Sequence, residues 1–172
     1  RFVMRPADLR LTDSLRKTMR KAGWSVTFDR SFETVMRRCS EVPRPGQDGT
    51  WITEEMIAAY CELHRRGIAH SVEVSWQGEL VGGLYGVALG RLFHGESMFH
   101  LKADASKVGF ATLVARLAAA GYVLIDCQVP TAHLASLGAF AVDRSEFLAA
   151  VKLFRDEPTS GDAFVTPASD AT

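Results

Sequence analysis

The strongest constraint on the fold is a stretch midway along the chain that has the pattern of three consecutive strands. These runs span residues 70–76, 79–89 and 91–99, and short connections containing Gly78 and Gly90 separate them. Glycine at such connections is typical of tight turns between neighbouring strands. The pattern therefore predicts an antiparallel meander in the middle of the chain.

Helical segments precede the meander. Apolar residues three or four positions apart, each set preceded by a proline or a capping residue, predict helices over about residues 6–22, after Ser31 and after Thr53. A short strand is predicted over residues 24–28, and the proline and glycine content of residues 43–49 predicts a loop. The first part of the chain is therefore expected to be mainly helical.

A different order follows the meander. We expect a helix from Asp104, a short buried strand over residues 122–129, one or two helical turns over residues 131–137, and a last helix from Asp143. Helices, a meander, and then helix, return strand and helix make an α+β domain in the order of the acetyltransferase-type (GNAT-type) fold. A likeness of fold alone says little about chemistry.

The end of the apolar periodicity predicts the domain boundary. Residues 1–155 are expected to form one domain, with basic helices over residues 1–40 and the core over residues 50–155. Residues 156–172 show no periodicity and are expected to form a flexible tail.

Composition excludes several classes of protein. With 47% hydrophobic and 23% charged residues, the chain resembles globular proteins rather than disordered or fibrous ones. No apolar run approaches the roughly 18 residues of a membrane span and no signal-peptide pattern is present, so we expect no membrane association. The 3 scattered cysteines provide neither a disulfide framework nor a paired metal motif, so a cytoplasmic location is expected.

The net charge of zero conceals an uneven distribution. Residues 1–40 contain ten Lys/Arg and four Asp/Glu and carry +6, whereas residues 41–172 carry −6. Four cations share one face of the first predicted helix, namely Arg16, Lys17, Arg20 and Lys21. A charged helical face is usually only solvated, but a basic patch of this kind can also contact nucleic acid.

Six short motifs carry a resemblance to a known family. They are GTWIT at residues 49–53, HSVE at 70–73, GGLYGV at 82–87, GESMF at 95–99, LIDCQV at 124–129 and HLASLG at 133–138. Over about residues 2–154 the chain resembles the bacterial leucyl/phenylalanyl-tRNA–protein transferases. Members of this family usually carry a further N-terminal domain, and this chain is expected to begin where that domain ends.

The resemblance implies a function. It implies transfer of Leu or Phe from leucyl- or phenylalanyl-tRNA to the α-amino group of an acceptor protein that begins with Arg or Lys. This transfer marks the acceptor for degradation by the N-end rule. The resemblance implies neither a metal nor any other cofactor.

Asp126 and Gln128 are the first candidate catalytic residues. They are two positions apart on a predicted strand, so their side chains share one face while Cys127 points to the other. A buried Asp needs a hydrogen-bond partner and can orient the neighbouring Gln amide, whose oxygen can then accept a hydrogen bond from the attacking amine. The resemblance implies that this pair is the catalytic relay. The alternative is that both residues only satisfy neighbouring backbone groups.

Glu96 is the third candidate catalytic residue. Alternation along its strand places it on one face with His94, Met98 and His100. A carboxylate suits the cationic first residue of the acceptor, and the resemblance implies this role. The alternatives are an ordinary cross-strand ion pair, or a metal site formed by His94, Glu96 and His100, although side chains this far apart on an extended strand diverge.

The resemblance also implies residues that contact the aminoacyl-tRNA. The pocket for the aminoacyl side chain is expected to be lined by Leu84, Phe110, Leu113 and Ile125. The terminal adenosine is expected to stack near Trp51, Tyr60 and Phe93. The tRNA backbone is expected to meet Arg16, Lys17, Arg20 and Lys21. For the apolar and aromatic residues the alternative is ordinary core packing.

Three other functions were weighed. A small-molecule N-acetyltransferase of the same fold usually has a glycine-rich R/Q-x-x-G-x-G pyrophosphate loop, which is missing where the helix after the meander begins. A non-catalytic module that binds tRNA or a peptide remains an alternative. A thiol nucleophile formed by Cys127 and His133 is disfavoured, because Cys127 faces away from Asp126 and no glycine elbow surrounds it.

Overall fold

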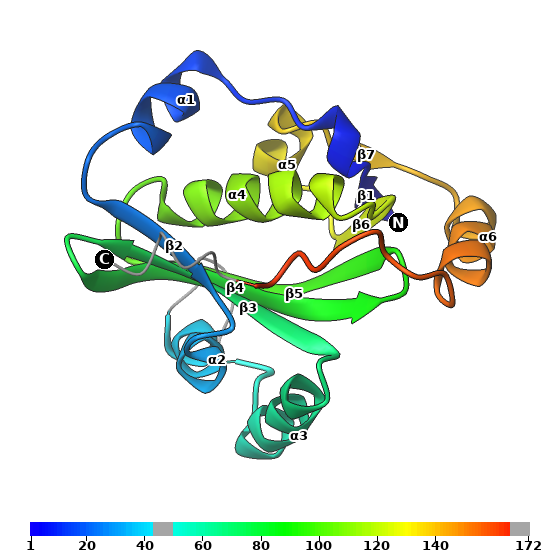
Figure 1. The fold of residues 1–172 in the computed structure, drawn as a ribbon, viewed down its shortest axis with the longest axis horizontal. Helices are drawn as coiled ribbons and strands as arrows, with labels where there is room; N and C mark the ends of the chain where they lie inside the picture. Colours follow the sequence, from blue (N-terminus) through cyan, green and yellow to red (C-terminus); the bar gives the residue numbers. More distant parts are fainter. Residues whose placement is uncertain (43–49, 166–172) are drawn as a thin grey trace.

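A computed structural model describes residues 1–42 and 50–165 of the chain (Figure 1). The strands are β1 (Phe2–Met4), β2 (Trp24–Phe28), β3 (Ala69–Trp76), β4 (Glu79–Leu89), β5 (Leu92–His100), β6 (Leu124–Gln128) and β7 (Phe140–Ala141). The helices are η1 (Pro6–Asp8, a 3-10 turn), α1 (Asp13–Met19), α2 (Phe32–Glu41), α3 (Glu54–Arg65), α4 (Ala105–Ala119), α5 (Ala132–Ser136) and α6 (Arg144–Phe154). The predicted loop over residues 43–49 lies outside the described residues.

The strands form one sheet of 7 strands in the order β2-β3-β4-β5-β6-β1-β7. Strands β2 to β5 are antiparallel neighbours, so the predicted meander is confirmed. Strand β6 lies parallel to β5, which requires a crossover, and α4 provides it. The α+β prediction and the acetyltransferase-type order of meander, helix and return strand are therefore confirmed.

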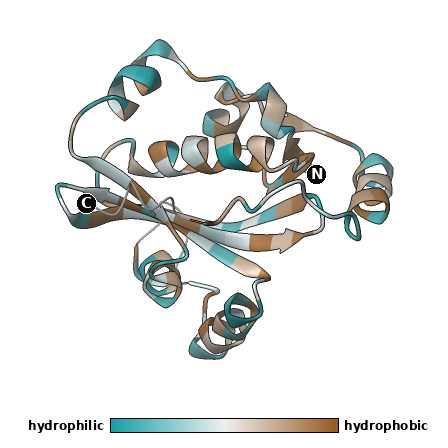
Figure 2. Cartoon of the chain, in the orientation of Figure 1, coloured by the Kyte–Doolittle hydropathy of each residue, from teal (hydrophilic) through white to brown (hydrophobic). Residues whose placement is uncertain are grey.

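Helices cover both faces of the sheet. Helix α4 lies on one face, and α2 and α3 lie on the other (Figure 1). The larger core cluster joins α4 to the sheet, and a smaller cluster joins α2 and α3 to the opposite face. Hydrophobic residues accordingly recur along the strands and along α4 (Figure 2). The cluster to which a strand residue belongs therefore shows which face of the sheet its side chain occupies.

Helix α4 approaches the sheet closely because β4 carries Gly82 beneath it. A Cβ atom placed at Gly82 would lie 2.7 Å from the Cβ of Ala105, at the start of α4. A larger residue at position 82 would therefore push the helix away from the sheet.

The N-terminal region differs from the prediction. The helix expected over residues 6–22 is divided into η1 and α1, because the chain leaves the helical path between them and the Arg10 N–H donates to the Leu137 carbonyl at 2.9 Å. Strands β1 and β7 were not predicted, since runs of 3 and 2 residues are too short to show periodicity. Because β1 and β2 belong to the central sheet, residues 1–40 are an integral part of the domain.

Residues 156–165 are the described part of the tail expected over residues 156–172, and they contact the rest of the domain. Phe164 is buried in the larger core cluster and stacks on His70, with 3.7 Å between the ring centroids. The Ser160 N–H donates to the Ala120 carbonyl at 2.9 Å. A segment without helical or strand periodicity is thus anchored by one aromatic side chain, and residues 166–172 lie outside the described residues. Of the helices in residues 1–42 and 50–165, none is both long and apolar enough to span a membrane.

Candidate active site

The candidate site lies where strands β5 and β6 cease to pair. Their parallel ladder comprises Leu92 with Leu124, Phe93 with Ile125, and His94 with Asp126, and it ends there. The next residues of the two strands are Gly95 and Glu96 on β5, and Cys127 and Gln128 on β6. The end of the ladder brings Glu96, Asp126 and Gln128 together, although Glu96 and Asp126 are far apart in the sequence.

A β-bulge gives Glu96 its position. In the β4–β5 ladder Gly86 pairs with Gly95 and Tyr85 pairs with Ser97, so Glu96 is an extra residue with no direct partner. The bulge requires glycine at position 86, because a Cβ atom there would lie only 2.3 Å from the His94 carbonyl oxygen. Bulges of this kind redirect side chains and occur often beside active sites.

The bulge corrects the expectation that His94, Glu96, Met98 and His100 share one face. Phe93 belongs to the core cluster under α4, whereas Phe99, six residues later, belongs to the cluster on the α2 and α3 face. Strict alternation would place both rings on the same face. Since Met98 packs against the cluster under α4, His94 and Met98 point to opposite faces.

Asp126 is almost completely buried, at 2% exposure, and its carboxylate is surrounded by donors. The Arg1 guanidinium donates from Nε at 3.0 Å and from Nη2 at 2.8 Å. His94 Nδ1 lies 3.4 Å from Oδ2, and the Gln128 backbone N–H donates to Oδ1 at 2.9 Å. The carboxylate therefore joins β1, β5 and β6 at one point.

These donors decide the protonation state of Asp126. Burial raises the pKa of the carboxyl group, but the hydrogen bonds from His94, Arg1 and the Gln128 backbone outweigh it and hold the pKa below its usual value. Asp126 is therefore ionised at neutral pH, as a buried carboxylate with enough donors can be.

Gln128 takes an unusual backbone conformation, with a φ of 63°, at the end of β6. Its side-chain Nε2 donates to the Gly95 carbonyl at 2.5 Å and lies 3.5 Å from Oε2 of Glu96. Asp126 thus holds Gln128 through the backbone and not through the side-chain amide that the sequence led us to expect. The amide oxygen accepts no hydrogen bond from the described residues, so it is available to a substrate donor.

Glu96 has a second neighbour in Tyr60, on α3. The Tyr60 hydroxyl hydrogen-bonds to the Glu96 carboxylate, and burial together with the nearby Glu96 charge raises the pKa of Tyr60 to about 12. The Tyr60 ring packs edge-on against Tyr85 of β4, with 5.5 Å between centroids. The Tyr60 hydroxyl is therefore protonated at neutral pH and meets the Glu96 carboxylate as a neutral group.

The four residues expected to line the aminoacyl pocket lie together, but in the closed core under α4. Their exposures are 3% for Leu84, 5% for Phe110, and 0% for Leu113 and Ile125. Glu96 packs near Tyr60 on the opposite face of the sheet. In this structure the four side chains are thus core residues and do not line an open pocket.

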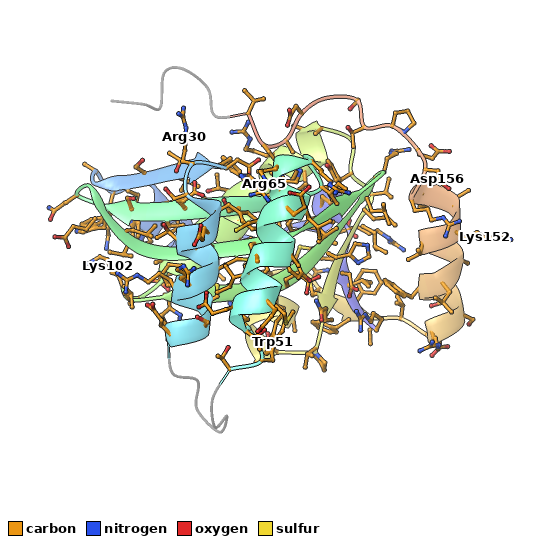
Figure 3. All side chains as sticks on the ribbon, turned by 90° about the horizontal axis from the view of Figure 1, so that it is seen from below. Arg30, Trp51, Arg65, Lys102, Lys152 and Asp156 are labelled. Carbon is orange, nitrogen blue, oxygen red and sulfur yellow. The ribbon has the colours of Figure 1, made fainter. Side chains whose placement is uncertain are left out.

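The three aromatic residues expected to stack on the terminal adenosine are not brought together. Trp51 is 40% exposed just before α3 (Figure 3), and Tyr60 lies further along the same helix. Phe93 is buried under α4, on the other face of the sheet from Tyr60. Of these three, Trp51 is the ring most open to a base.

The basic residues on and after α1 are all exposed, as the prediction of a tRNA-facing surface requires. These are Arg16, Lys17, Arg20 and Lys21. Leu15 of the same helix is buried against α4, so the cations face outward. Exposure alone does not distinguish contact with RNA from ordinary solvation.

Two rival chemistries find no support. Within residues 1–42 and 50–165, no group of three or more His, Cys, Asp or Glu side chains is placed to hold a metal ion, so the proposed set of His94, Glu96 and His100 does not assemble. Burial and the neighbouring Asp126 charge raise the pKa of Cys127 to about 12. The Cys127 thiol is therefore protonated at neutral pH and is a poor nucleophile.

Sequence reasoning missed Arg1 as a partner of Asp126, and it considered His94 only as a metal ligand. Residues 1 and 126 contact each other because β1 pairs with β6, and β1 is only 3 residues long. The one available signal was that a buried Asp requires hydrogen-bond donors. This requirement does not identify the residues that provide the donors.

The comparison with known families defines the class of the protein as an acyltransferase. Residues 3–152 match the family described as leucyl/phenylalanyl-tRNA protein transferase. The chain belongs to this family.

Individual relatives agree with the family match. The chain is 57% identical over 160 residues to a leucyl/phenylalanyl-tRNA–protein transferase of Pseudomonas putida, covering 93% of this chain and 70% of the relative. It is 56% identical over 162 residues to that of Pseudomonas aeruginosa, covering 94% and 71%. A GCN5-related N-acetyltransferase from Kribbella flavida aligns with 81% of this chain and 52% of its own, at a TM-score of 0.44 and 11% identity.

Proposed function

We propose that this protein transfers Leu or Phe from aminoacyl-tRNA to the α-amino group of acceptor proteins that begin with Arg or Lys. The transfer would take place in the cytoplasm and mark the acceptor for the N-end rule pathway. The observation that carries the proposal is the contact among Glu96, Asp126 and Gln128 at the end of the β5–β6 ladder, in a chain of this family.

The reaction needs positioning more than activation. The amine nitrogen attacks the ester carbonyl, a C–N bond forms, the bond to the 3′ oxygen of the tRNA breaks, and the amine proton ends on that oxygen. Because Nε2 of Gln128 donates to the Gly95 carbonyl, the amide oxygen of Gln128 is directed to accept from the attacking amine. Holding the amine and the ester together can lower the barrier by roughly 7–11 kcal/mol.

Asp126 acts through Gln128 in this proposal. At 2% exposure its carboxylate is too deeply buried to meet a substrate, and its oxygens already accept from Arg1, His94 and Gln128. It is therefore a positioning residue that fixes the backbone of Gln128, and the proton passes to the leaving oxygen directly or through water.

Glu96 would recognise the acceptor. It is half-buried beside Gln128, so a cationic first residue that reaches Glu96 brings its own α-amine to the Gln128 amide. A guanidinium can bind such a carboxylate through two parallel hydrogen bonds. The protonated Tyr60 hydroxyl lies beside this carboxylate.

The decisive experiment measures transfer of labelled Leu and Phe from charged tRNA to peptides headed by Arg, Lys or Ala. We expect transfer to the Arg and Lys peptides and little to the Ala peptide. Equal transfer to all three peptides would show that Glu96 does not select the first residue of the acceptor. Binding of charged tRNA without transfer to any peptide would indicate a non-catalytic module, and saturable binding of acetyl-CoA would favour an N-acetyltransferase.

A further inference from the structure

A second surface of the molecule has the composition of a binding site. A pocket of about 340 Å³ lies between the end of α1, the start of β2, the end of β3 and the connection from β5 to α4. Its lining residues are Thr18, Lys21, Trp24, Trp76, Lys102, Ala103 and Asp104. None of these residues belongs to the cluster of Glu96, Asp126 and Gln128, and only Lys21 is shared with the basic surface described above.

Two indole rings form the apolar part of this pocket. Trp24 and Trp76 pair directly across the β2–β3 ladder, with ring centroids 4.8 Å apart at an interplanar angle of 66°. Both rings are half-buried, so each keeps some accessible surface. The Nε1–H of Trp24 is buried and finds no acceptor among the described residues. An indole N–H normally has a partner when it is buried, so this unpartnered group marks Trp24 as an unusual residue of the pocket wall.

The charge of the pocket is positive. Lys102 Nζ lies over the Trp76 ring, 4.7 Å from its centroid, and Lys21, which also lines the pocket, is exposed. The acid that lines the pocket, Asp104, is neutralised by Lys107 at 2.7 Å. Two cations beside two indole rings suit a guest that combines an aromatic ring with a negative charge.

We propose that this pocket binds an unpaired nucleotide of the tRNA, with its base against the Trp24–Trp76 pair and its phosphate between Lys21 and Lys102. Nucleotides offer the required combination, since every base has a π face and every linkage carries a negative charge. The pocket is small for a whole cofactor, since ligand pockets run from about 300 to 1,000 Å³, but it suits a single base.

The position of the pocket favours RNA over a free nucleotide. Lys21 belongs both to the pocket and to the row of cations on and after α1 that is proposed to meet the tRNA backbone. A strand that follows this row would pass the mouth of the pocket. The inference therefore rests on the proposed function, and it adds a base-binding site to a surface otherwise limited to contacts with phosphate.

The test measures binding of deacylated leucine-accepting tRNA, so that it is independent of transfer. The chain contains 3 tryptophans, and Trp51→Phe leaves only the two of the pocket as fluorophores. We expect tRNA to quench this fluorescence saturably. In an anisotropy titration with labelled tRNA, Trp76→Leu should weaken binding roughly 5- to 150-fold without changing its salt dependence, whereas Trp76→Phe should largely restore it.

Lysine variants separate the charge from the ring. Lys102→Gln should reduce the slope of log affinity against log salt by about one. Lys152→Gln on α6 is the matched control, because Lys152 lies at the opposite end of the molecule from Lys102 (Figure 3), and it should leave the slope unchanged. If Trp76→Leu does not fold, as judged by circular dichroism, the change of salt slope in Lys102→Gln decides.

Several results would overturn the proposal. It fails if tRNA binds the Trp76→Leu and Lys102→Gln variants as it binds the wild-type protein, or if AMP or GMP saturates the quenching while tRNA does not. Wild-type transfer together with unchanged tRNA binding by these variants would reject the pocket alone. Absence of transfer together with Trp76-dependent tRNA binding would reject the proposed function and support the pocket.

Discussion

Asp126 accepts a hydrogen bond at 2.9 Å from the backbone N–H of Gln128, while the Gln128 side chain turns away to the Gly95 carbonyl. The two residues of the proposed relay are therefore linked through the main chain. Asp126 holds the end of β6 in place, and Gln128 presents its amide oxygen. This division of roles gives different expectations for the two positions.

Gln128→Ala should slow transfer by roughly 100-fold while the protein keeps its stability, because the variant loses the group that positions the amine. Single-turnover transfer to an Arg-headed peptide measures the rate, and urea unfolding measures the stability. Transfer at the wild-type rate by a folded Gln128→Ala protein would show that the relay assignment is wrong.

Asp126→Asn should lower both rate and stability, because an amide cannot accept from Arg1, His94 and the Gln128 backbone as a carboxylate does. A lost partner in a buried group costs about 1–3 kcal/mol. The pKa of Asp126 is lowered from 3.8 in the folded protein, so its contribution is present above that pH and is lost as the pH falls below it.

Unfolding by urea at several acidic pH values checks this pH dependence. The wild-type protein should lose stability below about pH 4 more steeply than Asp126→Asn. Asp156→Asn is the control, since Asp156 is an exposed carboxylate with 83% side-chain exposure. Parallel curves for the wild-type protein and Asp126→Asn would contradict the assignment.

Glu96→Gln should lower the pKa of Tyr60 from about 12, but not to the ordinary value of a tyrosine. Burial is the larger cause of the raised pKa, and the charge of Glu96 is the smaller one. Alkaline titration followed by ultraviolet absorbance, with Tyr60→Phe subtracted, isolates this phenol. An unchanged Tyr60 titration in Glu96→Gln would mean that the two groups do not interact in solution.

Replacing the four cations Arg16, Lys17, Arg20 and Lys21 with Gln should reduce the slope of log tRNA affinity against log salt by about three, since each phosphate contact contributes roughly 0.7–0.9. Filter binding at several salt concentrations measures the slope. Lys152→Gln combined with Arg155→Gln, both on or beside α6, should leave it unaltered. An unaltered slope in the fourfold variant would show that these four cations contact solvent and not the tRNA.

Phe164→Ala should destabilise the protein by about 3–5 kcal/mol, as expected for removal of a buried aromatic ring. Val165→Ala, at a neighbouring position with 58% exposure, should change stability by no more than about 0.5 kcal/mol. Equilibrium urea unfolding compares the two. Similar small effects for both would show that residues 156–165 are not anchored in solution.

The sequence by itself determined the order and type of most elements. Strand, turn and helix preferences act over a few neighbouring residues, so they are legible without knowledge of the fold. The meander over β3 to β5 follows from this, as do the start of α3, where Thr53 caps the Met56 N–H, and the capping box of Asp143 and Glu146 that begins α6.

Only the tertiary structure decided the surroundings of the candidate site. One extra residue at Glu96 reverses the faces of β5, and no local pattern signals it. Asp126 meets Arg1 because a short strand pairs with β6, and Phe164 is buried because one ring fills a place in a core formed by other segments. These features depend on the register between segments distant in the chain, which residue spacing along a single segment does not encode.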